Sequence, residues 1–443
     1  SSDDRIDESK LSPIVLWGKD VNKGIITSST TNRKGIVANL DIGPTITDFL
    51  NITMIKKSGN VIDWVDEDNA YDFVVNMNSR INITSKVRSK TLTTYGIFSV
   101  IVMLLVLITL SLKIKIDNRI GSILEILLIN LYSLPLVFLL VSLLNINNML
   151  KFLFGLVIFI SLFIVISVKC NRKKLLHLIT FFYFILITLD ILTDELFSKF
   201  SVLSHDPIIG ARYFGVGNEM VGLFLAVSML SLGLLYDRFH NKAINLAITF
   251  ILVLLVGHPN LGANIGGLIT FLSAGIYYTI EIFDKKLNIK SLIIIGISII
   301  AVVAVLGFVD VKLNPNTTHL GKTLVQIGNE GLYIVENIVV RKLLMNIKLV
   351  GISFWTKVLL FNVIIHVIIS ILYRNIFDII VEKGVQKVYL SCIVGSIIGF
   401  MVNDSGLILS SIAINMITIY YLFIIVNRSQ HMGNRKWINY GKS

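Results

Sequence analysis

Long apolar runs separated by short polar connections fill most of this chain. From residue 93 to residue 427 the runs are about 20 residues long, which is the length that a helix needs to cross a bilayer. The whole chain contains only 6 prolines, so the runs are largely uninterrupted. Read in windows of about 19 residues, the pattern predicts spans at 94–112, 122–144, 150–168, 174–193, 216–236, 243–257, 265–283, 291–309, 352–373, 386–402 and 406–426.

The first 92 residues follow a different pattern. Residues 11–18 have the composition of a strand, and residues 36–50 predict a short strand that leads into a helix starting near Pro44, after Asp41. We therefore predict a mainly α, polytopic membrane protein of about eleven spans with a small N-terminal α/β piece. Its parts are the N-terminal piece (1–92), the helical membrane domain (93–427) and a basic tail (428–443).

Composition agrees with a membrane protein, because 54% of the residues are hydrophobic and 15% are charged, against about 25% charged in soluble domains. Residues 1–92 contain equal numbers of basic and acidic residues, so the net charge of +12 belongs to the membrane part. Basic residues gather in alternate connections. The positive-inside rule then places residues 1–92 outside the plasma membrane and the tail in the cytoplasm. We expect the lipid bilayer as a partner and no nucleic acid.

Cysteine and histidine placement predicts neither a disulfide nor a metal centre. Cys170 falls in a predicted inner connection and Cys392 inside a span. No cluster of metal-ligand spacing occurs in residues 1–92, so we expect no metal and no other cofactor in this chain. His366 lies within an apolar run, where we expect a packed, hydrogen-bonded histidine.

Every polar, glycine-rich cluster of the membrane part falls on the predicted outer side. Asn218, Asn264 and Asn403 each stand four or five residues before the Gly/Leu start of a span that runs inward. Asparagine is a favoured N-cap, and three helix N-termini on one side would offer N–H groups and positive dipole ends to an anion. The candidate residues for binding an anion or a headgroup are Arg212, Asn218, Glu219, His258, Asn264, His319, Asn403 and Asp404.

Two interpretations of these clusters stay open. In the functional one they bind a phosphate or pyrophosphate headgroup, for which the planar fork of Arg212 is suited, and His258 and His319 act as acid–base groups or ligands. In the structural one they are caps, solvated loop residues and close helix contacts, because small residues are common where membrane helices meet. The connection 310–350 predicts one or two helices in the outer interface, which could cap a cavity or simply lie on the surface.

One segment of the N-terminal piece resembles a known family. The runs SPIVLWGKD and GIITSSTTNRKGIVANLDIGPTITDFL look like the C-terminal end of an alkaline-phosphatase-superfamily domain, as in sulfatases, phosphotransferases and cofactor-independent phosphoglycerate mutases. The layout of such a domain before many spans is similar to that of the ethanolamine-phosphate transferases of glycolipid-anchor synthesis. The resemblance covers residues 11–50 and rests on Ser28, Ser29, Thr30, Thr31, Arg33, Gly35, Asp41, Pro44 and Thr45.

The resemblance implies an outward-facing hydrolase or phosphotransferase domain in which Asp41 is structural. Such domains use a Ser or Thr nucleophile and paired divalent metals held by Asp and His. The chain has no histidine before His177, and it starts at Ser1 without a signal-like run. We therefore expect a fragment whose catalytic residues and divalent metal lie upstream.

Three functions are compatible with these features. The first is the membrane component of a cell-envelope phosphoryl-group transferase or hydrolase that acts on a lipid-linked or anionic envelope substrate at the outer face. The second is a transporter or lipid flippase, although charges within the spans are scarce and no inverted repeat is evident. The third is a membrane anchor or scaffold for an exported domain, for which so many spans are more than is needed.

Overall fold

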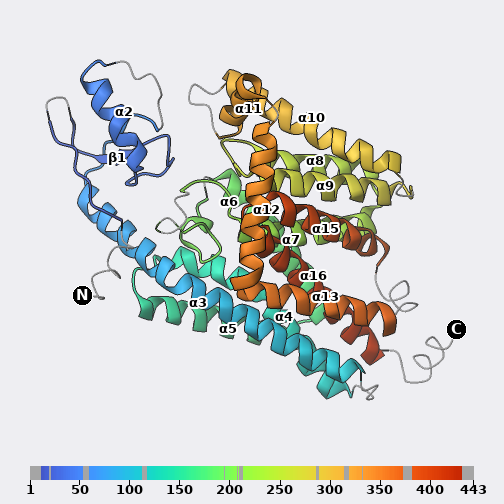
Figure 1. Cartoon of the computed structure of the whole chain (residues 1–443). Coiled ribbons are helices and arrows are strands. Elements are labelled where there is room, and N and C mark those ends of the chain that lie inside the picture. The colour runs from blue at the N-terminus through green and yellow to red at the C-terminus, as the bar shows by residue number, and fades with distance from the viewer. Residues whose placement is uncertain are drawn as a thin grey trace.

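A computed structural model gives the fold of the chain and describes residues 11–18, 21–52, 59–111, 117–193, 195–206, 208, 213–285, 289–313, 319–331, 333–372 and 382–431. Figure 1 shows a helical bundle with a small N-terminal piece at one corner. Nine helices among the described residues are long and apolar enough to cross a membrane. The protein is therefore a mainly α-helical, polytopic membrane protein with a small N-terminal α/β piece, as the sequence predicts.

Helices occur at each of the predicted spans. Nine of them meet the length and composition expected of a span in the described part of the chain, and the shorter apolar helix α8 and the helix α10 stand at the two remaining positions. The bundle helices are α3 (Ala70–Ser111), α4 (Asn118–Val141), α5 (Met149–Lys169), α6 (Arg172–Leu192), α7 (Asn218–Phe239), α8 (Lys242–Gly257), α9 (Ile265–Ile282), α10 (Ile289–Leu313), α13 (Phe354–Leu372), α15 (Lys383–Val402) and α16 (Gly406–His431).

The N-terminal piece corrects two predictions. Residues 11–18 form no strand, and Trp17 among them is 93% exposed; the only strand pair in the described chain joins β1 (Ile25–Thr27) to β2 (Asp63–Val65) in antiparallel fashion. A strand needs a hydrogen-bonding partner, and residues 11–18 meet none in the described chain. Residues 36–38 form no strand either, and α2 (Asn39–Phe49) begins five residues before Pro44.

Asp41 explains where α2 begins and why this piece holds together. Its fully buried carboxylate accepts the backbone N–H of Ala38 at 2.8 Å, which fixes the helix start in place of Pro44. The same carboxylate accepts the hydroxyls of Ser28 at 2.6 Å and Thr30 at 2.5 Å. Asp41 therefore holds together the turn after β1 and the start of α2.

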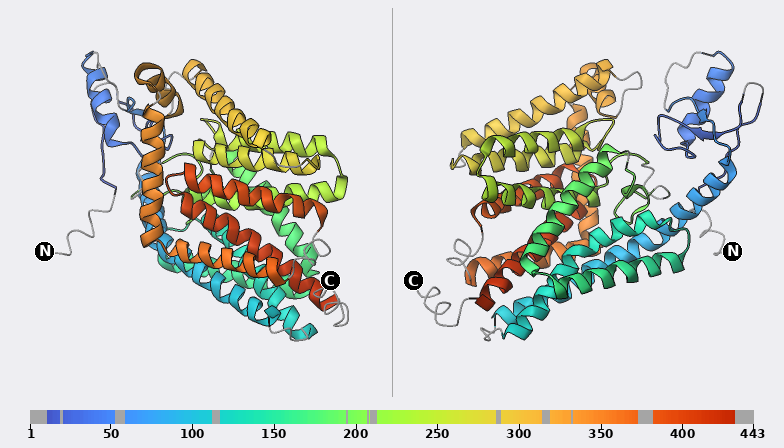
Figure 2. Two further views of the ribbon diagram at one scale, coloured as in Figure 1. Left: turned by 45° about the vertical axis from the view of Figure 1, so that its right-hand side comes forward. Right: turned by 180° about the vertical axis from the view of Figure 1, so that it is seen from behind.

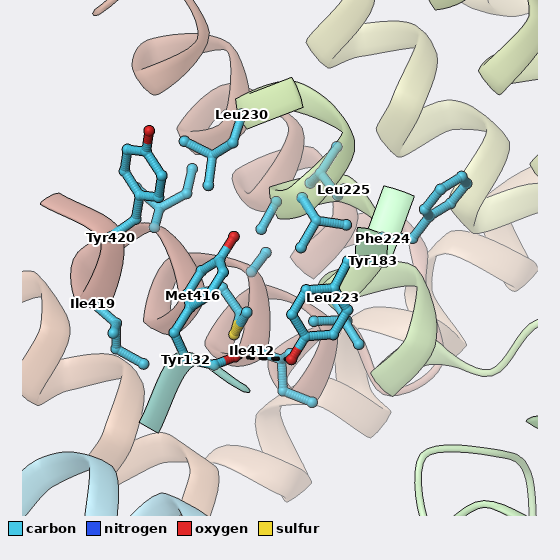
Figure 3. Packing of buried hydrophobic residues seen from close by; sticks show 14 of the residues in the cluster. Tyr132, Tyr183, Leu223, Phe224, Leu225, Leu230, Ile412, Met416, Ile419 and Tyr420 are labelled. Carbon is cyan, nitrogen blue, oxygen red and sulfur yellow. Dashed lines mark hydrogen bonds between the residues drawn. The ribbon is translucent and has the colours of Figure 1, made fainter. Parts of the chain in front are cut away.

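The bundle is built around α7 and α16, the two helices most enclosed by the others. In their apolar windows, 89% of α7 and 94% of α16 lie buried inside the protein. Figure 3 shows Leu223 and Phe224 of α7 among the aromatic and aliphatic side chains of α16 and its neighbours. A Cβ on Gly222 would stand 2.3 Å from the carbonyl oxygen of Leu409, so the two backbones approach closely only because this position is glycine.

A proline inside α4 shows how the bundle satisfies backbone groups in an apolar environment. Pro135 lies within the helix, where a proline disturbs the regular hydrogen bonds. The hydroxyl of Tyr183 from α6 enters at this point, accepts the N–H of Leu136 at 2.7 Å and donates to the carbonyl of Tyr132 at 2.8 Å. A side chain of a neighbouring helix thus replaces the interrupted backbone contact.

His366 of α13 behaves as the sequence predicts. Its Nδ1 lies 2.6 Å from the hydroxyl of Tyr389, and its Nε2 lies 2.9 Å from the hydroxyl of Thr418. Both ring nitrogens therefore have partners from other helices. The expectation of a packed, hydrogen-bonded histidine is confirmed.

The two ends of the bundle differ in their connections. The N-terminal piece and α12 (Tyr333–Ile352) lie at one end, and the last turn of α16 lies at the other (Figure 2). α12 runs across the direction of α15 and α16 (Figure 1). Together with α11 (His319–Glu330) it confirms that two helices form in the connection 310–350. The opposite end carries ion pairs between helices and loops, namely Arg172–Glu125, Lys173–Glu382 and Lys387–Asp284.

Candidate functional site

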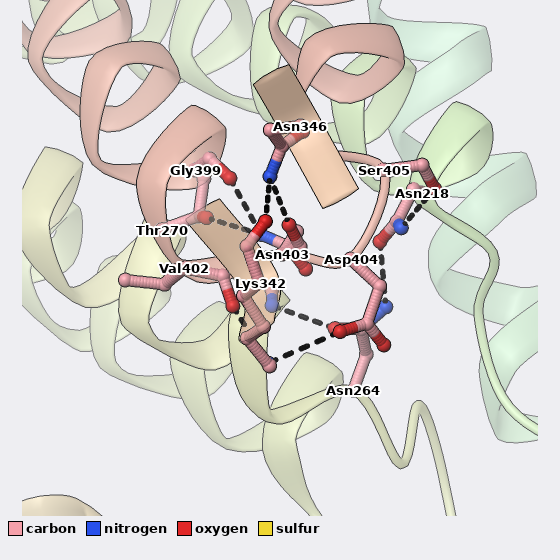
Figure 4. A network of polar contacts seen from close by, with 11 residues as sticks. Asn218, Asn264, Thr270, Lys342, Asn346, Gly399, Val402, Asn403, Asp404 and Ser405 are labelled. Carbon is pink, nitrogen blue, oxygen red and sulfur yellow. Dashed lines mark hydrogen bonds and ion pairs between the residues drawn. The ribbon is translucent and has the colours of Figure 1, made fainter. Parts of the chain in front are cut away.

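Four asparagines meet at the end of the bundle that α12 crosses (Figure 4). Asn218 is the first residue of α7, Asn264 precedes α9, Asn403 follows α15, and Asn346 comes from α12. The sequence predicts that the first three share one side of the membrane, and the structure brings them together. We call these four asparagines, with Ser405, the amide junction.

Asn218 and Asn264 link three helix starts. Asn264 Nδ2 donates to the carbonyl of Val216 at 2.8 Å and lies 3.5 Å from Asn218 Oδ1. Asn218 Nδ2 in turn donates to the hydroxyl of Ser405, just before α16, at 2.6 Å. An amide carries both donors and an acceptor, so it can bond to two segments at once. The starts of α7, α9 and α16 are therefore connected through side chains.

Asn346 joins α12 to the turn between α15 and α16. Its Nδ2 donates to the carbonyl of Asn403 at 2.7 Å, and its Oδ1 accepts the N–H of Leu407 at 3.0 Å. Only 1% of the Asn346 surface is exposed. This residue was missed from the sequence, because its importance depends on where α12 lies in space.

The capping roles differ from the prediction at two of the three asparagines. Asn264 is an N-cap as predicted, since its Oδ1 accepts the N–H of Gly267 at 2.7 Å. The N-cap of α7 is Gly217 instead of Asn218. Asn403 caps the C-terminus of α15, where its Nδ2 donates to the carbonyl of Gly399 at 3.0 Å. Asn403 therefore ends α15 and does not begin α16.

Glu219 and Asp404, the two carboxylates predicted at the mouths of spans, both face a cation. Arg88 of α3 pairs with Glu219 and also donates through Nε to the carbonyl of Ser204 at 3.1 Å. Lys342 of α12 lies 3.9 Å from Asp404 and donates to the carbonyl of Val402 at 2.7 Å. The Glu219 side chain is only 8% exposed, whereas Asp404 is 52% exposed.

The sequence contains only a weak indication of Arg88 and Lys342. Arg88 stands two helical turns after another arginine, Arg80, on a helix that enters an apolar run, and Lys342 stands one turn before Asn346. Such spacings place two side chains on one face of a helix. Packing decides which face of the helix meets the bundle, and the sequence alone does not reveal that face.

The remaining candidates stand outside the amide junction. Half-buried His258 ends α8, and its Nδ1 accepts the N–H of Asn260 at 3.2 Å, a contact within its own turn. His319 begins α11, and its side chain lies outside the described residues. Arg212 also lies outside them. The structure thus groups Asn218, Asn264, Asn403 and Asp404, while the carboxylate of Glu219 pairs with Arg88.

The hydrogen bonds of the amide junction hold helix ends together, and in this sense we call the junction a fastening. The N–H groups of Gly267 and Leu407, at two of the helix starts expected to meet an anion, already bind asparagine oxygens. A Cβ on Gly266 would lie 2.0 Å from Asn403 Oδ1, so α9 and this turn are in close contact. Both findings favour the structural interpretation of these clusters.

Metal binding has no support in the described part of the chain, where no group of three or more His, Cys, Asp or Glu residues could hold a metal ion. A search of known protein families, curated proteins and solved structures finds no match to this chain. Function must therefore be inferred from the residues and their geometry.

Proposed function

We propose that this chain is the membrane component of a cell-envelope phosphoryl-group transferase or hydrolase, acting on a lipid-linked or anionic substrate in the plasma membrane. In this proposal residues 1–92 stand on the outer side and the tail in the cytoplasm, as the distribution of basic residues favours. The observation that carries the proposal is the way in which α3 mounts the N-terminal piece on the bundle.

α3 is one continuous helix of 42 residues. At 1.5 Å per residue it is about 63 Å long, twice the thickness of the hydrocarbon layer. Its second half carries the apolar run from residue 94, so its first half extends beyond the membrane. The N-terminal piece is therefore joined to the membrane domain by a rigid element.

Side chains of the first half of α3 hold the connection that follows α6. Thr84 Oγ1 donates to the carbonyl of Phe200 at 3.1 Å, and Ser85 Oγ donates to Asp206 at 2.7 Å. Arg88 adds the pair with Glu219 at the start of α7. A simple anchor needs no such fixed orientation, whereas an enzyme that meets its substrate at the membrane surface does.

The resemblance of residues 11–50 to the alkaline-phosphatase superfamily supports phosphoryl chemistry in particular. Several of the residues that carry it, namely Ser28, Thr30 and Asp41, form one hydrogen-bonded unit. The described residues do not fit the paired metals of that superfamily. We therefore assign this chain the platform, and we expect the nucleophile and any divalent metal from another domain or chain.

A polar seam inside the bundle is the observation that favours the alternative of a transporter or flippase. Asn415 of α16 accepts the hydroxyl of Ser99 at 2.7 Å and donates to the hydroxyl of Tyr95 at 3.1 Å. Asn362 Nδ2 also lies 3.2 Å from Asn415 Oδ1. Polar groups within a membrane domain are costly and often mark a pathway, but they also fasten helices together.

The proposal is tested by removing the contacts that orient the N-terminal piece. Cells are labelled with radioactive orthophosphate, and the label is followed in the lipid fraction and in the envelope fraction. We expect the double variant Thr84→Val/Ser85→Ala to reduce movement of label between these fractions severalfold at an equal amount of protein in the membrane. Ser79→Ala is the matched control, because in the described chain the Ser79 hydroxyl bonds only to Val75 of its own helix.

Two results would contradict the proposal. One is an unchanged distribution of label in cells that lack the protein altogether. The other is transbilayer movement of a labelled lipid in vesicles that contain the original protein, combined with complete loss of label movement in the double variant. That pair of results would favour the flippase.

A further inference from the structure

A large cavity lies where the N-terminal piece meets the bundle. Its volume is about 1090 Å³, slightly above the range of about 300–1,000 Å³ that is common for ligand pockets. It is enclosed by the polar turn after β1, by β2, by the first turns of α3 and by η2 (Ser198–Phe200). None of the candidates for anion binding predicted from the sequence lines it, whereas Ser28, Ser29, Arg33 and Pro44 of the segment that carries the family resemblance do.

Positive charge dominates the lining. The acidic residue in it is Asp63, which is exposed, and the cations come from three separate segments. We call this cavity the basic cleft, and its cations are Arg33, Lys34, Arg80 and Lys199.

Two guanidinium groups are fixed on one aromatic ring. The Cζ atom of Arg80 lies 3.7 Å from the centre of the Phe200 ring, and that of Arg33 lies 4.8 Å from it. Arg33 is only 5% exposed, and its Nη2 donates to the carbonyl of Lys199 at 3.2 Å. The ring contacts both guanidinium groups through their faces, and the carbonyl of Lys199 fixes that of Arg33.

Arg80 has donor capacity to spare. Its Nη2 donates to the carbonyl of Ser142 at 2.8 Å, while its buried Nε has no hydrogen-bond partner in the described chain. A buried donor without a partner is unfavourable, and a ligand or water that accepts from it removes the penalty. The planar fork of arginine matches the oxygens of a phosphate group.

The cleft also lies beside the end of a candidate membrane span. Ser142, which accepts from Arg80, is the residue that directly follows α4. The next residues, Leu143 and Leu144, are 45% and 44% exposed. Because a span ends beside Arg80, a lipid headgroup at the surface of the bilayer can reach the cleft.

We propose that the basic cleft binds a phosphate-bearing headgroup, with Arg80 and Arg33 contacting the phosphate. The cleft is too large for orthophosphate alone, and Trp64 and Phe73 in its wall offer apolar surface to a sugar or glycerol portion. Binding in the cleft does not depend on the proposed function; only the phosphoryl transfer or hydrolysis that would follow binding rests on it. The same chemistry could be presented by a lipid in the bilayer or by a soluble phosphorylated compound.

The test measures binding by the full chain reconstituted in nanodiscs. The lipid probe is phosphatidic acid in vesicles, with phosphatidylcholine vesicles as the reference, and the soluble probe is glycerol phosphate. We expect binding of at least one phosphate probe and its weakening by added salt. Preference for the vesicles assigns a lipid source, and binding of glycerol phosphate assigns a soluble one.

Two variants and a control locate the site. Arg80→Gln should weaken binding at least tenfold, because hydrogen bonds to charged groups are among the strong ones. Lys34→Gln should weaken binding about two- to fivefold without affecting folding, because Lys34 is exposed. Lys23→Gln removes the charge of an exposed lysine outside the cleft and should change binding less than twofold.

The inference is overturned if neither probe binds, or if Lys34→Gln and a folded Arg80→Gln protein bind as tightly as the original. If binding depends on Arg80 but label movement is unchanged in cells that lack the protein, the basic cleft is a binding site and the transferase role is contradicted. The two proposals can therefore fail separately.

Discussion

The amide junction and the basic cleft lie at the same end of the bundle but are built in opposite ways. In the amide junction, the polar groups of Asn264 and Asn346 bond to other segments of the protein. In the basic cleft, Arg80 keeps a donor that has no hydrogen-bond partner among the described residues, beside a cavity. The comparison teaches that a polar cluster conspicuous in the sequence can be a fastening, while a binding site can be assembled from inconspicuous residues.

If this end of the bundle is held together by the amide junction and the contacts around it, substitutions at these contacts should lower stability more than binding. The largest effect is expected for Arg88→Met, which leaves the Glu219 carboxylate buried without its partner. We expect a loss of about 3 kcal/mol, the lower end of the range for a broken buried pair, because the Arg88 side chain is 21% exposed. Thermal unfolding in detergent measures it. The double variant Arg88→Met/Glu219→Met should recover part of the loss, and a single variant as stable as the original would contradict the account.

Gly266→Ala should come next. The new Cβ would stand 2.0 Å from Asn403 Oδ1, so the asparagine must move and its contacts with α15 weaken. Overpacking of this kind costs about 1–3 kcal/mol. The matched control is Gly328→Ala in α11, which meets nothing within 4 Å. Equal melting temperatures for the two variants would show that the junction is not closely packed.

Asp41→Asn tests the unit on which one wall of the basic cleft is built. Burial acts to raise the pKa of Asp41, but hydrogen bonds from Asn60, Ser28, Thr30 and Ala38 outweigh it and lower the pKa below its ordinary value. A lowered pKa contributes stability that is fully present above the ordinary value and is lost as the pH falls through the folded value. The amide should cost about 1–3 kcal/mol at neutral pH.

The measurement is protection of residues 21–52 against proteolysis as a function of pH. In the original protein we expect protection to fall on the acid side, and in Asp41→Asn we expect weaker protection that depends less on pH. Matching pH profiles would exclude Asp41 as the titrating group.

Lys342→Met should have the smallest effect. Its ammonium lies 3.9 Å from an Asp404 side chain that is 52% exposed, and pairs of this kind contribute about 1 kcal/mol or less. Added salt should reduce even this difference. A loss as large as that of Arg88→Met would mean that α12 is held mainly by charge.

Much of the fold could be predicted because the bilayer restricts it. Apolar runs of the right length must be helices in a membrane, so a helix occurs at each predicted span and nine of these helices are long and apolar enough to cross within the described residues. Asn264 could be recognised as a cap from its position before a helix. The strand expected at residues 11–18 fails because a strand needs a partner, and neighbouring residues do not reveal whether one exists.

The basic cleft could not be predicted from the sequence. Arg33, Arg80 and Phe200 are far apart along the chain, and they meet only because α3 extends beyond the apolar run and packs against η2. Sequence patterns report which face of a helix is apolar, but not which distant loop that helix meets.

The most direct test compares Arg80→Gln with Asn264→Ala, with melting temperature measured with and without the phosphate probe that binds. The account predicts that Arg80→Gln melts near the original protein but is no longer stabilised by the probe. Asn264→Ala should melt several degrees lower, because it loses a cap and the hydrogen bond to the carbonyl of Val216, and should keep its stabilisation by the probe. The reverse result, with probe binding lost at Asn264 and kept at Arg80, would contradict the assignment of fastening and binding site.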